Sequence, residues 1–177
     1  MVCEAERKEC WDTARKHIVE LLSLCVEQHG QRIMTYMLRN DVLPRALKLL
    51  AQRDKHLVLC ALRLLRQCIG VNEPQCNKYI VKKDLFAGVV SLLKQHLHRN
   101  NLINSAIIEL FDFLRTKNIK ALIKYLVEHY RAVYEGIGYV ETFKQLIVRY
   151  EQNEEYEREE ANGSLSSDPS HQAWGAA

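Results

Sequence analysis

Residues 21–50 read LLSLCVEQHGQRIMTYMLRNDVLPRALKLL, and residues 64–93 read LLRQCIGVNEPQCNKYIVKKDLFAGVVSLL. At a spacing of 43 residues, the second segment repeats the Leu-Leu pairs, the Cys, the Tyr and the Asp of the first. A period of about 40 to 47 residues, built from helices alone, is typical of armadillo and HEAT repeats. Such repeats stack and bury one another's apolar faces, and they present extended surfaces to other proteins. The repeat therefore predicts a binding scaffold.

Apolar residues recur at helical spacing along most of the chain. The predicted helices cover residues 13–28, 31–38, 42–50, 55–69, 74–81, 85–95, 101–115, 119–130 and 139–160. Asp41 and Asp84 precede two of these runs, where we expect their side chains to act as N-caps. The segment 55–69 is apolar around most of its circumference, so we expect a central helix with Leu62 in the core.

The predicted fold is all-α. It is an armadillo/HEAT-like right-handed helical solenoid of about three to four repeats over residues 1–160. Residues 161–177 are rich in Ser, Gly, Pro and Asn, and we expect them to form a disordered tail. No window approaches 18 consecutive apolar residues and no signal peptide is evident, so neither a membrane span nor a secreted protein is expected.

The charge is distributed unevenly. Residues 1–150 contain 24 Lys and Arg against 15 Asp and Glu, a balance of +9, whereas residues 151–177 contain one Arg against seven acids, a balance of −6. A basic body favours an acidic partner, or an acidic segment of the chain that screens its own body. A merely solvated surface explains the same numbers.

The residues of an enzyme or a metal site are not evident. The six cysteines show no C-x₂₋₄-C spacing, and the pairs His56/Cys60 and His96/His98 each offer only two ligands. There is no glycine-rich phosphate loop and no nucleophile elbow. We expect a protein without catalytic activity, cofactor, metal or small-molecule substrate.

Polar residues within the apolar long helices are the candidate partner-binding site. In armadillo-like stacks the last helix of each repeat lines the concave surface, and Arg and Asn side chains there suit a partner's backbone or carboxylates. The candidates are Arg63, Arg66, Asn101, Asn104 and Ser105. Equally, Arg63 or Arg66 could pair within the chain, with Glu109 or Asp112.

A second hypothesis is binding of nucleic acid, or of another acidic partner, by a basic solenoid. Its candidate residues are Arg53, Lys55, Arg63, Arg66, Lys78, Lys82 and Lys83. Because no aromatic residues alternate with them to stack on bases, nucleic acid is the less favoured partner.

Several segments resemble a known family. They are Leu59-Cys-Ala-Leu-Arg63, the run from Asn77 to Phe86, the run from Asn101 to Leu114, Tyr139-Val-Glu-Thr-Phe-Lys144 and Arg149-Tyr-Glu-Gln152. In this order they resemble the armadillo-like SMK-1 region of regulatory subunit 3 of protein phosphatase 4, the SMEK/Falafel family, over about residues 15–155.

The resemblance implies a non-catalytic scaffold in a Ser/Thr phosphatase complex. The implied partners are the phosphatase 4 catalytic subunit and regulatory subunit 2, and the implied location is the nucleus and the cytoplasm. Family members begin with an EVH1 domain that captures substrates. No such segment precedes residue 15, so we do not expect that route of substrate recruitment here.

Overall fold

The computed structural model describes residues 4–97 and 99–164, and within them the chain is helical with no β-strand. The elements in chain order are α1 (Glu4–His29), α2 (Gln31–Arg39), α3 (Val42–Leu47), the 3₁₀ helix η1 (Lys48–Ala51), α4 (Lys55–Gly70), α5 (Pro74–Lys82), α6 (Phe86–His96), α7 (Leu102–Lys117), α8 (Lys120–Glu135) and α9 (Glu141–Ser164). None of these helices is long and apolar enough to cross a membrane.

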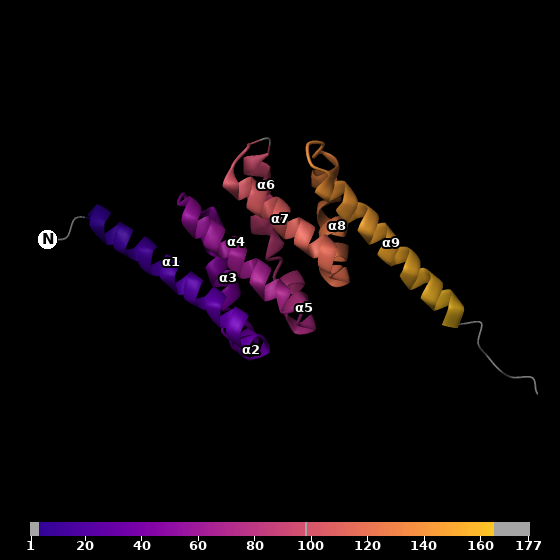
Figure 1. The fold of residues 1–177 in the computed structure, drawn as a ribbon, viewed down its shortest axis with the longest axis horizontal. Helices are drawn as coiled ribbons and strands as arrows, with labels where there is room; N and C mark the ends of the chain where they lie inside the picture. Colours follow the sequence, from indigo (N-terminus) through magenta and orange to yellow (C-terminus); the bar gives the residue numbers. More distant parts are fainter. Residues whose placement is uncertain (1–3, 98, 165–177) are drawn as a thin grey trace, which may run out of the picture.

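Equivalent helices of successive repeats lie side by side. The long helices α1, α4, α7 and α9 form one row, in which each packs against the next (Figure 1). The helices α2, α5 and α8 form a second row that is packed in the same order. This stacking of equivalent elements confirms the all-α solenoid that the repeat predicted.

Local sequence sets several of the helix ends. Asp54 accepts a hydrogen bond from the backbone N–H of His56 and so caps α4, and Pro74 occupies the first turn of α5. Gly30 separates α1 from α2 at a φ of +47°, a region that glycine enters at little cost. Asn118, at the same φ, ends α7 in the left-handed conformation.

The core runs continuously through the repeats. In α4, two stripes are buried, and they comprise Leu57, Ala61, Leu64 and Cys68 on one side and Val58, Leu62, Leu65 and Ile69 on the other. Leu62 is 3 % exposed, as the sequence predicted. Phe111 of α7 lies in an aromatic cluster with Phe86, Tyr134 and Phe143, which joins α6 to the last two helices.

The two repeated aspartates do not cap helices, contrary to the prediction. Asp41 and Asp84 adopt positive φ values of 50° and 47°, and neither residue caps the following helix with its side chain. Instead, each carboxylate accepts a hydrogen bond from a tyrosine of the next repeat: Asp41 from Tyr79, and Asp84 from Tyr125. We call each of these pairs a tyrosine–aspartate rung.

The acidic segment lies on a basic face of its own chain. In α9, Glu151, Glu154 and Glu157 form ion pairs with residues of α8, which are Arg131 at 3.1 Å, Lys124 at 2.7 Å and Lys120 at 3.6 Å. The helix continues to Ser164, past the boundary predicted at residue 160, and residues 165–177 of the predicted tail lie outside the described residues.

Candidate protein-binding groove

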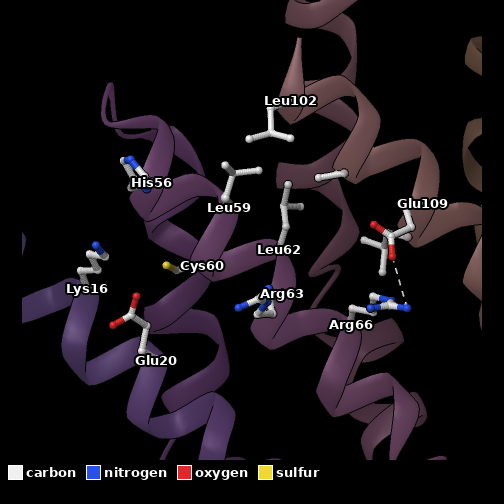
Figure 2. Close-up of a pocket in the computed structure, with 12 residues that line it drawn as sticks. Lys16, Glu20, His56, Leu59, Cys60, Leu62, Arg63, Arg66, Leu102 and Glu109 are labelled. Atoms are coloured by element: carbon white, nitrogen blue, oxygen red, sulfur yellow. Dashed lines mark ion pairs between the residues drawn. The ribbon is translucent and has the colours of Figure 1, made fainter.

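A groove follows the exposed ridge of α4 between α1 and α7. One hollow of this groove has a volume of about 410 Å³ and is lined by Lys16, Glu20, His56, Leu59, Cys60, Leu62, Arg63, Arg66, Leu102, Ala106, Glu109 and Leu110 (Figure 2). Two further hollows, of about 180 and 540 Å³, share lining residues with it, and Gln67 lines both. We call the three hollows together the α4 groove.

The length of the α4 groove suits an extended segment of another protein. A helix of 16 residues such as α4 is about 24 Å long, at about 1.5 Å per residue. At about 3.3 Å per residue, an extended chain of about seven residues spans that length.

Arg66 is held in place by its own chain. Its guanidinium group lies 3.3 Å from the Glu109 carboxylate and 5.0 Å from the centre of the Phe113 ring. The sequence left open whether Arg66 is free for a partner or pairs within the chain. In the structure it pairs within the chain, with Glu109. Both charged side chains are about half exposed, at 45 % and 63 %, and an ion pair of this kind contributes at most about 1 kcal/mol. A partner carboxylate can compete for Arg66.

Arg63 differs from Arg66 although both lie on the same ridge. Its side chain is exposed between those of Glu20 and Arg66 (Figure 2). Among the described residues no carboxylate forms an ion pair with Arg63, and Asp112 pairs instead with Arg115 at 2.8 Å. The guanidinium group therefore presents its donors to the groove.

Cys60 contributes a neutral surface to the groove. Burial, and then the nearby Glu20 carboxylate, raises the pKa of the Cys60 thiol. Because the thiolate is the nucleophilic form, this cysteine is protonated and unreactive at neutral pH.

The other three candidate residues build the start of α7. Asn101 caps the helix, since its side chain accepts a hydrogen bond from the backbone N–H of Asn104 at 2.9 Å. Asn104 is buried, donates to the carbonyl of Arg99 and accepts from the Tyr139 hydroxyl. The Ser105 hydroxyl donates to the Asn101 carbonyl at 3.3 Å. None of the three lines the hollows of the α4 groove, which the structure therefore assigns to Arg63 and Arg66 alone among the candidates.

Sequence reasoning missed three residues that line the groove. Lys16 and Glu20 come from α1, and the repeat could have indicated them, because shifting Leu59 and Arg63 back by 43 residues places Lys16 and Glu20 on the ridge of α1. Leu102, the first residue of α7, is 69 % exposed although it is apolar.

The basic residues of the nucleic-acid hypothesis do not form one free cluster. Arg53 lies just before α4 and Lys55 is its first residue, Arg63 and Arg66 lie on its ridge, and Lys78, Lys82 and Lys83 lie in or just after α5. Lys83 pairs with Asp41 at 3.5 Å, and Arg66 pairs with Glu109. In residues 4–97 and 99–164, no group of three or more His, Cys, Asp or Glu is arranged to hold a metal ion.

Comparison with known proteins identifies the family. The family described as Phosphatase 4 regulatory subunit 3 matches residues 4–152, most of the chain. The chain belongs to the phosphatase 4 regulatory subunit 3 family. The resemblance found in the sequence is thereby confirmed.

The chain matches only a small part of the length of two curated relatives from the phosphatase 4 regulatory subunit 3 family. It is 42 % identical over 135 residues to mouse Protein PPP4R3C1 and 42 % identical over 135 residues to the Drosophila melanogaster Serine/threonine-protein phosphatase 4 regulatory subunit 3. Each match covers 76 % of this chain but only 17 % and 14 % of the respective relatives. No solved structure matches the chain.

Proposed function

We propose that this chain is a non-catalytic scaffold of a Ser/Thr protein phosphatase 4 complex and that it binds its partners through the α4 groove. The proposed partners are the phosphatase 4 catalytic subunit and regulatory subunit 2. Family membership supports the regulatory role, since the Drosophila relative is named as a phosphatase 4 regulatory subunit. We further propose that the chain acts in the nucleus and the cytoplasm.

The observation that carries the proposal is the unpaired Arg63 in a long, partly apolar groove. Arg63 offers donors to a carboxylate or a carbonyl, whereas Leu59 and Leu102 offer apolar surface beside it. The buried Oε1 atom of Gln67, on the same ridge, has no hydrogen-bond donor within the described part of the chain. A backbone N–H of a bound segment would satisfy this acceptor after a small rotation of the amide. These groups favour an extended segment that carries an acidic residue.

The experiment is a binding measurement with recombinant phosphatase 4 catalytic subunit and regulatory subunit 2, each alone and together. We expect binding by the wild-type chain and a loss of at least tenfold in affinity for Arg63→Glu, about 1.4 kcal/mol. Arg39→Glu is the matched control. It makes the same charge reversal on an exposed side chain of α2 that does not line the groove, and its affinity should stay within twofold.

Each outcome has a distinct meaning. If neither subunit binds the wild-type chain, the scaffold role is refuted. If both subunits bind and Arg63→Glu behaves as Arg39→Glu does, the role stands but the groove is not the binding site. Circular dichroism of the two variants verifies that both fold.

A further inference from the structure

Gly70 is a residue of α4 that the fold does not require to be glycine. It is the last residue of the helix, it is exposed, and its φ is not positive. A Cβ atom at this position would lie 3.5 Å from Cζ of Phe113, which is an ordinary van der Waals contact. Because glycine weakens a helix relative to alanine, alanine would serve the fold better here.

The repeat shows which side chain the glycine leaves out. Shifted back by 43 residues, position 70 falls on Glu27. Shifted forward by 45 residues, the spacing that relates Leu65 to Leu110, it falls on Arg115. Both equivalents carry long charged side chains. Gly70 carries none, and it lines the hollow of about 540 Å³ in the α4 groove, which we call the Gly70 hollow.

The Gly70 hollow offers apolar surface without a strong preference for one sign of charge. Its apolar lining residues are Val26, Val71 and Phe113. Of its charged lining residues, Glu27 and Lys117 are opposite in sign, and Arg66 is paired with Glu109. An apolar side chain placed in this hollow would therefore gain from leaving water.

Three different groups follow one another along the exposed ridge of α4. Arg63 offers hydrogen-bond donors, the Oε1 atom of Gln67 accepts no hydrogen bond within the described part of the chain, and Gly70 opens the hollow. Spacings of four and three residues place them on one face of the helix. At about 1.5 Å per residue, Arg63 and Gly70 lie about 10 Å apart along the helix axis.

An extended segment can match this order of groups. A polyproline II helix returns to the same face after three residues and advances about 9 Å. A segment in this conformation could place an acidic side chain at Arg63, a backbone N–H at Gln67 and another side chain in the Gly70 hollow.

We infer that the Gly70 hollow receives a large apolar side chain of the segment bound in the α4 groove, three residues from the acidic residue that meets Arg63. Gly70 is then a specificity-determining residue. The partner segment carries an acidic and an apolar residue with two residues between them. This inference rests on the proposed use of the α4 groove, and it adds the apolar half of the motif that the groove recognises.

Selection from a phage-displayed library of random heptapeptides tests the inference on the full chain. The wild-type chain should enrich Asp or Glu together with Leu, Ile, Met or Phe three positions away. Gly70→Leu fills the hollow and should abolish the apolar preference while the acidic preference remains. Arg63→Glu should abolish the acidic preference. Gly70→Ala is the matched control, since its single methyl group makes only an ordinary contact, and it should keep both preferences.

A fluorescein-labelled selected peptide gives the size of the effect. Gly70→Leu should weaken its binding about tenfold, as expected when a buried leucine-sized side chain is displaced, and Gly70→Ala should stay within about twofold. Both variants should melt no lower than the wild type, because both replace a helical glycine.

The outcomes separate this inference from the proposed function. An acidic preference without an apolar residue at the three-residue spacing overturns the inference and leaves the groove as a binding site. An apolar preference that survives Gly70→Leu also overturns it. If the wild-type chain enriches neither residue type, both the inference and the proposed use of the groove are overturned. The library contains no phosphatase subunit, so a failure of the scaffold role would not change these results.

Discussion

Replacing Phe111 with Ala should remove a central aromatic contact between α7 and the last two helices. Phe111 is 0 % exposed, and its ring centre lies 5.2 Å from that of Phe143, 5.5 Å from that of Tyr134 and 6.2 Å from that of Phe86. Substitution of a buried Phe by Ala costs about 3–5 kcal/mol. Because this ring also makes three aromatic contacts, each worth about 0.5–1.5 kcal/mol, we expect about 4–5 kcal/mol.

Urea denaturation followed by circular dichroism measures this loss for Phe111→Ala. Phe113→Ala on the same helix is the control, since Phe113 is only half-buried beside Arg66 and should cost about 1–1.5 kcal/mol. A loss below about 2 kcal/mol for Phe111→Ala would refute the reasoning, because it would mean that the aromatic cluster does not join α7 to α8 and α9.

Two further predictions concern stability. Leu62→Asp places a carboxylate without a partner in the core of α4 and should cost about 3 kcal/mol or more, and an unchanged urea midpoint would contradict this packing. Burial and the hydrogen bond to Asp41 raise the pKa of Tyr79 to about 12, from about 10 in the unfolded chain. Its contribution to stability should therefore be complete below pH 10 and lost as the pH rises through 12. Urea midpoints between pH 9 and 12 should fall less steeply for Tyr79→Phe than for the wild type, and equal slopes would argue against this contribution.

The periodicity of the sequence predicted the helices and their stacking, because helical repeats of this length bury their apolar faces against neighbouring repeats. It could not predict where the polar side chains go. Asp41 and Asp84 each precede an apolar run, as an N-cap does, but their positive φ values direct the carboxylates to a tyrosine about 40 residues away. The signal was present in the sequence as the recurrence of Tyr and Asp in the same repeat.

The sequence predicted only some of the residues of the candidate groove. Arg63 and Arg66 follow from the ridge of α4, since a helix packed on both sides leaves only one exposed strip. Asn104 could not be recognised as buried, because its partners, the carbonyl of Arg99 and the hydroxyl of Tyr139, come from loops whose course the spacing does not fix. The pairing of Arg66 with Glu109 was foreseen only as one of two alternatives.

The tyrosine–aspartate rungs join successive repeats along the row of α2, α5 and α8 only. Hydrogen bonds to a carboxylate are directional and resist separation, whereas the apolar contacts between the long helices tolerate small sliding. When its ends are pulled, the stack should bend: the row of α2, α5 and α8 should keep its spacing, and the row of long helices should slide. The α4 groove lies in the row of long helices, away from these hydrogen bonds, so we expect its width to change more readily than the spacing of α2, α5 and α8.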